Sequence, residues 1–174
     1  MNEIRITQEL FLSPEFQALN FGTRALYIFM MAESDEDGVC FFDIDASNDY
    51  DISYNIAKRN KKILKDAGFI SYISPSEYML CHQGKGRAVK TPKEFLLSDF
   101  VELTSQTQLI YFALWMESKG DIARFDRPTV TKYGFSYVTV LKHVESLRQA
   151  KLLRCHDINE YRLLPIEGME VIAS

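Results

Sequence analysis

The sequence predicts an α+β protein, mainly helical with small β hairpins, in which one structural unit occurs twice. Residues 22–34 align with residues 106–118 at an offset of 84 positions. Residues 53–80 align with residues 136–163 at an offset of 83, so one residue of length separates the copies. The matched pairs include Thr23/Thr107, Tyr27/Tyr111, Glu33/Glu117, Ser34/Ser118, Ser53/Ser136 and Leu64/Leu147.

Length and composition suit two small units that pack on each other. The chain has 174 residues, of which 47% are hydrophobic and 13% aromatic, enough for a core. No apolar run approaches the roughly 20 residues that span a bilayer, and the N-terminal residues lack the apolar stretch of a signal peptide. We therefore expect a cytoplasmic protein with no membrane partner.

The repeat divides the chain into three parts. Residues 1–83 form the first unit, residues 84–94 a basic linker or extended wing, and residues 95–174 the second unit. Each unit opens with a short apolar arm, residues 5–12 in the first and residues 95–97 in the second, which we expect to pack on its own unit.

The first helix of each unit is predicted at residues 23–32 and 107–116. Both segments are apolar almost all round, which is typical of a central, buried helix and needs no cofactor to explain it. A polar turn and a short apolar run follow in each copy. A short second helix then ends at Tyr50 in the first copy and at Tyr133 in the second.

Ser53 and Ser136 open the third helix of each copy, because a serine hydroxyl can accept a hydrogen bond from an unpaired first-turn amide. Two strands follow that helix in each unit. In the first copy we expect residues 69–73 to pair with 78–81, and in the second residues 152–155 with 161–164. Helix, strand, helix, turn, helix and hairpin is the winged-helix order.

Residues 134–153 resemble the passage from recognition helix to wing in bacterial winged helix-turn-helix proteins. A small capping residue starts the helix, and Val140, Val144 and Leu147 dock it inward. The first copy departs from this pattern, since Lys61 stands where the second copy has Val144.

Residues 10–19, with the helix around Tyr27, are similar to the N-terminal domains of plasmid and phage replication initiators. These resemblances imply a sequence-recognising, double-stranded DNA-binding protein of a plasmid, phage or other mobile element. Its role would be replication initiation or transcriptional regulation.

A recognition helix in the major groove reads bases with arginine, asparagine or glutamine and holds phosphates with lysine, serine or tyrosine. Asn55, Arg59 and Asn60 are the base-reading candidates of the first copy. The full set of expected DNA contacts is Ser53, Tyr54, Asn55, Lys58, Arg59, Asn60 and Lys62 in the first unit, Lys85, Arg87 and Lys90 in the connecting segment, and Ser136, Tyr137, Thr139, Lys142 and His143 in the second unit.

The net charge of −4 and the sequence pI near 5.4 oppose this interpretation, because DNA-binding domains are usually basic. Carboxylates crowd the second helix of the first copy, at Asp43, Asp45, Asp49 and Asp51. Such a helix would face the DNA backbone and repel it. The alternative function is an acidic tandem winged-helix scaffold that binds protein, with a homodimer or protein partner at the acidic helix.

The sequence favours no enzyme and predicts no cofactor. It contains no glycine-rich phosphate cradle and no recognisable catalytic triad motif. Cys81-His82 and Cys155-His156 offer metal-ligand types, but the pairs fall at different positions of the repeat. We therefore expect no metal site and read the three cysteines as reduced thiols.

Overall fold

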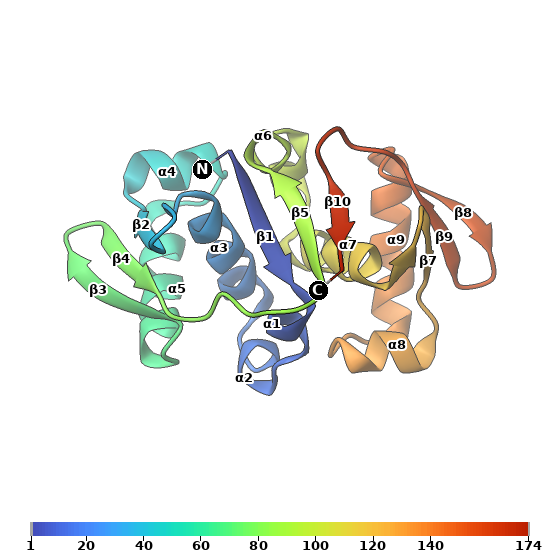
Figure 1. Cartoon of the computed structure of the whole chain (residues 1–174), viewed down its shortest axis with the longest axis horizontal. Coiled ribbons are helices and arrows are strands. Elements are labelled where there is room, and N and C mark those ends of the chain that lie inside the picture. Colours follow the sequence, from blue (N-terminus) through green and yellow to red (C-terminus); the bar gives the residue numbers. More distant parts are fainter. Residues whose placement is uncertain (1, 174) are drawn as a thin grey trace.

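The computed structural model describes residues 2–173, and the predicted order of elements is present in both halves (Figure 1). The α+β prediction is confirmed, with three small antiparallel sheets among the helices. The first unit contains β1 (Glu3–Thr7), α1 (Gln8–Leu12), α2 (Pro14–Gln17), α3 (Phe21–Ala32), β2 (Val39–Phe41), α4 (Ile44–Asp49), α5 (Tyr54–Asp66), β3 (Ile70–Ser74) and β4 (Glu77–Leu80).

The second unit repeats this order with short additions. It contains β5 (Ala88–Pro92), α6 (Lys93–Leu96), the 3-10 helix η1 (Asp99–Glu102), α7 (Ser105–Glu117), β6 (Ser118–Lys119), β7 (Ile122–Arg124), α8 (Arg127–Lys132), α9 (Tyr137–Gln149), β8 (Leu153–Asp157), β9 (Glu160–Leu163) and β10 (Glu170–Ile172). The one-residue length change lies in the turn before β2, because Ser34 pairs with Cys40 where Ser118 pairs with Ala123.

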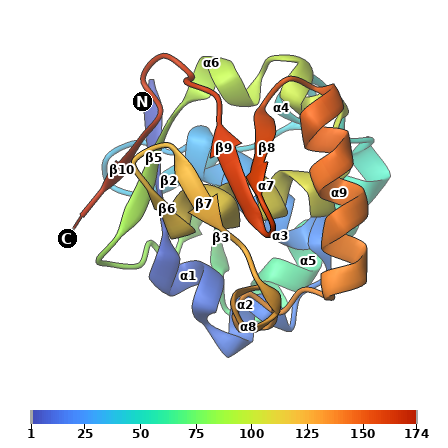
Figure 2. The same ribbon diagram turned by 90° about the vertical axis from the view of Figure 1, so that its right-hand side faces the viewer.

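A central sheet joins the two units, with strand order β1-β5-β10. β1 and β5 run antiparallel, and Arg5 at the middle of β1 lies opposite Lys90 at the middle of β5. Each unit also has its own sheet, ordered β2-β4-β3 in the first and β6-β7-β9-β8 in the second. These two sheets lie at opposite ends of the long axis in Figure 1, and Figure 2 looks onto the second one.

Helices α3 and α7 pack on each other at the centre of the molecule. Every residue of α3 from Thr23 to Ala32 is buried, as is every residue of α7 from Thr107 to Met116. This explains why both helices are apolar on all sides: each is surrounded by its own unit and by the other helix. The predicted central helices are confirmed, and the buried residues of both units form one continuous core.

The connecting segment differs from its expectation. Residues 84–94 were expected to be a linker or extended wing, but Ala88–Pro92 form β5, the middle strand of the central sheet. Ala88, Val89 and Thr91 are buried there. The strand carries no regular alternation, since Ala88 and Val89 are both buried and Lys90 and Pro92 are half-buried, and the basic residues around it also hide the strand.

The first arm and the residues that follow it contact both units rather than only their own. Phe11 of the first arm lies 5.5 Å from Phe16, and 6.5 Å from Phe112 of the second unit, between ring centroids. Gln17 donates a hydrogen bond to the Lys132 carbonyl in the second unit, and Phe21 stacks on Phe135. The two units are therefore tied together by side chains as well as by the sheet.

Candidate nucleic-acid interface

A groove runs between α5 and the β3–β4 hairpin, at one end of the molecule. Its volume is about 720 Å³, and it is closed at one side by the start of α4. Its lining combines cationic side chains of α5 with tyrosines of the helix and the hairpin: Asp43, Ile44, Tyr54, Asn55, Lys58, Arg59, Lys61, Lys62, Lys65, Tyr72, Pro75, Ser76 and Tyr78.

The local sequence explains how α5 presents these side chains. Ser53 begins the helix by accepting a hydrogen bond from the Ile56 amide, as expected of an N-cap. Ala57, Asn60 and Leu64 are buried on the inner face, so the cations between them point outward. Gly68 follows the helix at a φ of +80°, a conformation that glycine adopts at little cost, and the chain turns there into β3.

Most of the expected α5 contacts do lie together on this surface. Ser53, Tyr54, Asn55, Lys58, Arg59 and Lys62 are all exposed. Lys62 forms an exposed ion pair of 2.6 Å with Asp66, whereas Lys58 and Arg59 have no ion-pair partner within residues 2–173. Two cations are thus available to an anionic ligand without breaking a contact.

Asn60 was expected to read bases, and this is wrong. Its side chain is only 2% exposed and faces the start of α3, where its Nδ2 lies 3.4 Å from the position that a Gly22 Cβ would occupy. The helical spacing places Asn60 one turn from Ala57 and Leu64 on the inward face. It is a core polar residue and cannot touch DNA.

Lys61 stands at the repeat position of the buried Val144, and its contacts show how a lysine fits there. Its ammonium donates a hydrogen bond of 3.1 Å to the Phe42 carbonyl and lies 5.1 Å from the Tyr78 ring centroid. Burial lowers the pKa of Lys61 from its ordinary value. The aliphatic part of the side chain can cover apolar surface while the charge reaches the groove.

The hairpin contributes residues that sequence reasoning missed. Tyr72 and Tyr78 pack edge to face, with 6.3 Å between ring centroids, and the Lys65 ammonium lies 5.9 Å from the Tyr72 ring. Tyr72 is 55% exposed. The available signal was the pair of tyrosines in a short hairpin directly after a lysine-rich helix.

The acidic helix borders the groove, but its carboxylates differ in role. Asp43 caps α4, because its Oδ1 accepts a hydrogen bond of 3.0 Å from the Ala46 amide. Asp45 and Asp49 are exposed and lie one turn apart, as the sequence predicted. Asp43 lines the groove itself, and Asp45 and Asp49 lie further along α4.

The basic connecting segment makes contacts within the protein. Arg87 donates hydrogen bonds to the carbonyls of Met116 and Ser118, and Lys90 forms ion pairs of 3.0 and 3.5 Å with Glu3 and Glu170. These two cations hold the central sheet and α7 together, so the structure does not place them with the α5 surface. Lys85 is exposed, and its backbone amide donates to Glu9.

The second unit offers a much weaker surface at the equivalent place. His143 is half-buried, within 2.7 Å of the Thr107 hydroxyl, and Thr139 is also half-buried. Tyr137 lies under the Arg127 guanidinium and its hydroxyl bonds to Asn159. Ser136 and Lys142 remain exposed, but within the described chain no side-chain hydrogen bond from Ser136 caps α9.

The exposed part of α9 is apolar where α5 is polar. Val138 and Leu141 are 63% and 44% exposed, and they stand at the repeat positions of Asn55 and Lys58.

No family model matches this chain, and no curated protein or solved structure matches it either.

Within residues 2–173 no group of three or more His, Cys, Asp or Glu side chains could hold a metal ion. No helix in the same range is long and apolar enough to cross a membrane. Cys40 is buried, which raises the pKa of its thiol to about 12, while Cys81 and Cys155 are exposed.

Proposed function

We propose that the two units are winged helices and that the protein binds double-stranded DNA through the α5 groove of the first unit. The observation that carries the proposal is the exposed, cationic face of α5 beside a hairpin that bears tyrosines. Such a helix suits the major groove, and an adjoining hairpin suits the phosphate backbone. The protein would recognise DNA sequence for replication initiation or transcriptional regulation on a plasmid, phage or other mobile element.

Arg59 and Asn55 are the base-reading residues of this proposal. Both are exposed and lie about one turn apart on α5, and their side chains suit guanine and adenine edges respectively. Lys58, Lys62 and Lys65 would neutralise phosphates. Because Asn60 is buried, sequence preference would rest on fewer side chains than the sequence alone indicates.

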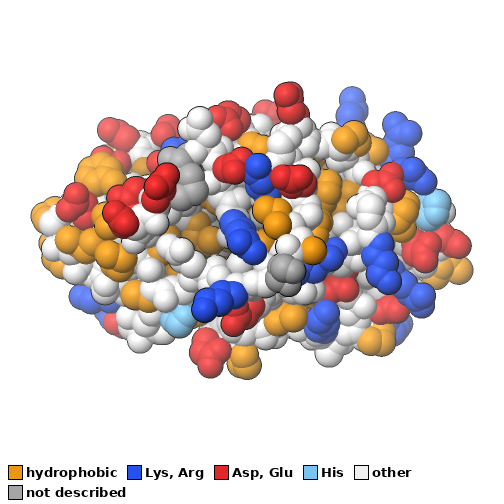
Figure 3. Space-filling view, in the orientation of Figure 1, with side chains coloured by type: hydrophobic (Ala, Val, Ile, Leu, Met, Phe, Trp, Pro, Cys, Tyr) orange, Lys and Arg blue, Asp and Glu red, His pale blue; other side chains and the backbone are white. Residues whose placement is uncertain are grey.

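A protein-binding scaffold is the second candidate, and one observation favours it. Ile44 and Tyr72 line the groove and are 50% and 55% exposed, and Phe41 of β2 and Ile73 of β3 are 53% and 47% exposed. Figure 3 shows hydrophobic side chains gathered at the end of the molecule where the β3–β4 hairpin lies. An apolar rim of this kind is typical of a surface that contacts protein.

A salt titration separates the two candidates. We would measure binding of the full chain to a labelled duplex of random sequence by fluorescence anisotropy over increasing salt. Phosphate contacts release counterions, so affinity should fall steeply as salt rises. The triple variant Lys58→Ala, Arg59→Ala, Lys62→Ala should bind more weakly and show a shallower slope.

The matched control removes three exposed cations of the second unit, Lys142, Arg148 and Arg154, by substitution with alanine. It carries the same change in net charge and should bind nearly as well as the unmodified chain. Failure of the unmodified chain to bind duplex at low salt would reject DNA binding and favour the scaffold. Equal losses in both triple variants would reject the α5 groove as the site.

A further inference from the structure

The outer edge of β1 is open. In the β1–β5 pair, the Gln8 amide bonds to the Arg87 carbonyl and the Lys93 amide to the Asn2 carbonyl. Hydrogen-bonded pairs in an antiparallel ladder recur every second residue. The backbone amides and carbonyls of the even-numbered β1 residues therefore point toward β5. The amides and carbonyls of Glu3 and Arg5 therefore point outward, and no strand within residues 2–173 pairs with that edge.

The repeat provides a template for what this edge can bind. Glu3 and Arg5 correspond to Ala88 and Lys90 of β5, because the β1–β5 pairing is symmetric about Arg5 and Lys90. The same offset of 85 positions, one more than at residues 22–34, also matches Glu9 with Glu94 and Ser13 with Ser98. In the second unit these two β5 residues pair with β10, Ala88 with Ile172 and Lys90 with Glu170. The outer edge of β1 is thus equivalent to the β5 edge that pairs with β10, but no strand within residues 2–173 pairs with it.

The connections to the central strands support this equivalence. Gly84 and Gly168 stand 84 positions apart, and each passes closely over the end of the first strand of its unit. A Cβ on Gly84 would meet Thr7, and a Cβ on Gly168 would lie 2.8 Å from Pro92. The chain continues from Gly168 into β10, but from Gly84 it crosses to the far side of β1 and forms β5.

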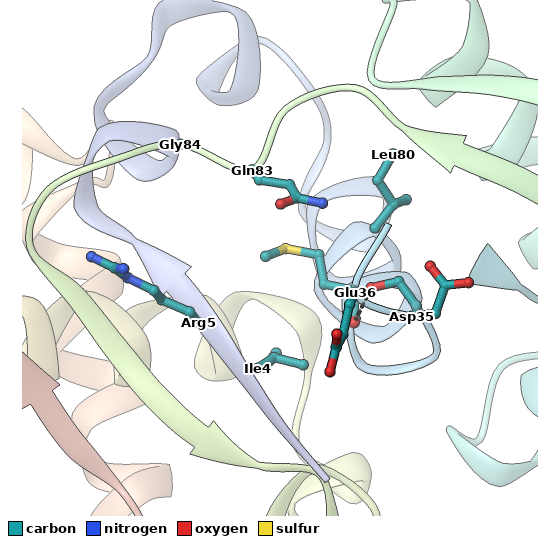
Figure 4. A pocket seen from close by; sticks show the side chains of 9 residues that line it. Ile4, Arg5, Asp35, Glu36, Leu80, Gln83 and Gly84 are labelled. Atoms are coloured by element: carbon teal, nitrogen blue, oxygen red, sulfur yellow. Dashed lines mark hydrogen bonds between the residues drawn. The ribbon is translucent and has the colours of Figure 1, made fainter. Parts of the chain in front are cut away.

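A hollow of about 220 Å³ lies beside the open edge (Figure 4). Ile4, Met31 and Leu80 give it an apolar wall, and the turn that contains Asp35 and Glu36 closes the opposite side. In the second unit the segment that forms β10 covers the corresponding region: Met169 belongs to the core and Val171 packs against it. The hollow therefore occupies, in the first unit, the position that the β10 segment fills in the second unit, and no strand within residues 2–173 fills it.

Arg5 supplies a charge that the occupant can match. Lys90 forms ion pairs with Glu3 and Glu170, whereas Arg5 has no carboxylate partner within the described residues. Its guanidinium bonds only to the Gly86 carbonyl, at 2.8 Å, and the side chain is exposed. A carboxylate directly opposite Arg5 would reproduce the Lys90–Glu170 pair.

We propose that the outer edge of β1 binds an extended segment of a partner protein, which adds as an antiparallel strand with an acidic residue opposite Arg5 and apolar residues beside it. Strand addition of this kind gains affinity from main-chain hydrogen bonds and specificity from alternate side chains. The sequence Met169-Glu170-Val171-Ile172 has the required pattern, because it fills the equivalent place on β5. The surface is separate from the α5 groove, so the proposal does not depend on DNA binding.

The test uses a labelled peptide with the sequence of residues 166–173 as the probe and the full chain as the receptor. Binding is measured by fluorescence anisotropy. Arg5→Glu should weaken binding by about tenfold or more, and a peptide with Glu170→Lys should restore binding to that variant. Arg154→Glu, an equally large charge change on an exposed residue of β8, should leave binding unchanged.

Backbone methylation of the peptide tests the strand geometry. N-methylation at Glu170 or Ile172 should abolish binding, since those amides face the receptor strand, whereas N-methylation at Val171 should be tolerated. Equal effects at all three positions would overturn strand addition. A loss caused by Lys90→Glu but not by Arg5→Glu would also overturn the proposal, because the peptide would then be displacing β10 from β5. Absence of binding to the unmodified chain would overturn it directly.

Discussion

Glu33 and Glu117 occupy equivalent positions in the two units, and each joins a tyrosine of its own unit to the first residue of a short helix, α6 or α1, of the other. Glu33 accepts hydrogen bonds from Tyr50 at 2.8 Å and from Lys93 at 2.7 Å. Glu117 accepts from Tyr133 at 2.6 Å and from Gln8 at 3.1 Å. The repeat therefore conserves a contact between units, and not only the core of each unit.

Loss of either carboxylate charge should destabilise the protein. We expect Glu33→Gln and Glu117→Gln each to lower the free energy of unfolding by about 1–2 kcal/mol, because hydrogen bonds to a charged, largely buried acceptor would be weakened. Urea denaturation measures the change. Glu36→Gln, on an exposed turn, is the control and should alter stability by less than about 0.5 kcal/mol. An equal effect at all three positions would refute the role of the two contacts.

The α5 surface should distinguish a base contact from a phosphate contact. Arg59→Ala should weaken binding to the preferred duplex by about 1–3 kcal/mol and relax base preference at one position. Lys62→Ala should weaken binding evenly across sequences, since it removes a phosphate contact. Competition assays with a library of duplexes measure both effects.

Lys142→Ala is the matched control, because Lys142 occupies the position of Arg59 in the second unit. It should change neither affinity nor preference appreciably. If Arg59→Ala and Lys62→Ala cause the same loss for every sequence, Arg59 touches only phosphate.

Removal of charge from α4 should strengthen nonspecific DNA binding. The double variant Asp45→Asn, Asp49→Asn keeps side-chain size and removes two exposed carboxylates from α4, the helix whose start lines the groove. Affinity for random duplex at low salt should rise, and its salt dependence should steepen as nearby lysines engage phosphates. Fluorescence anisotropy measures both quantities.

The double variant Asp99→Asn, Asp157→Asn removes the same charge from exposed positions in the second unit and serves as the control. It should give a smaller gain. The scaffold alternative predicts no gain from the α4 variant on DNA. A gain of equal size in the two double variants would show that net charge alone governs binding.

His143 should make the protein less stable in acid. Burial, with a smaller effect of Lys142, lowers the pKa of His143 from its ordinary value of 6.5. The unfolded chain therefore takes up this proton at a higher pH than the folded chain does. The stabilisation is complete above pH 6.5 and declines as the pH falls toward the folded-state pKa.

Replacement with Asn, the residue at the equivalent position 60, tests this effect. Between pH 7.5 and pH 5 the Tm of His143→Asn should fall by less than that of the unmodified chain, and calorimetry gives both values. His156→Asn changes an exposed histidine and should follow the unmodified chain. An identical fall in Tm for all three proteins would contradict the linkage.

The local elements of this fold could be predicted because they depend on nearby residues. Apolar residues on every side indicated α3 and α7 as central helices, and the lysine-rich pattern indicated α5 and its outward face. The central sheet could not be predicted in the same way. Its strands β1, β5 and β10 come from distant parts of the chain, and short strands carry little periodicity of their own.

The candidate site could be predicted only in part, because contacts with residues distant in sequence decide which side chains are exposed. Six of the seven expected residues around α5 are exposed together, but Asn60 is buried because helix rotation depends on which residues face the core. Lys61 obscured that rotation, since a lysine occupies a position that is apolar in the second unit. The cations Arg87 and Lys90 were assigned to DNA from their charge, whereas their partners lie in parts of the chain distant in sequence.

The most direct test of DNA binding through α5 is a two-dimensional amide NMR titration of the full chain with a short duplex. We expect the amides of Tyr54–Asp66 and of the β3–β4 hairpin to shift, while those of Tyr137–Gln149 stay in place. The shifts should reverse when salt is added, as expected for contacts with phosphates. Shifts centred on Tyr137–Gln149, or a spectrum unchanged by the duplex, would contradict DNA binding through α5.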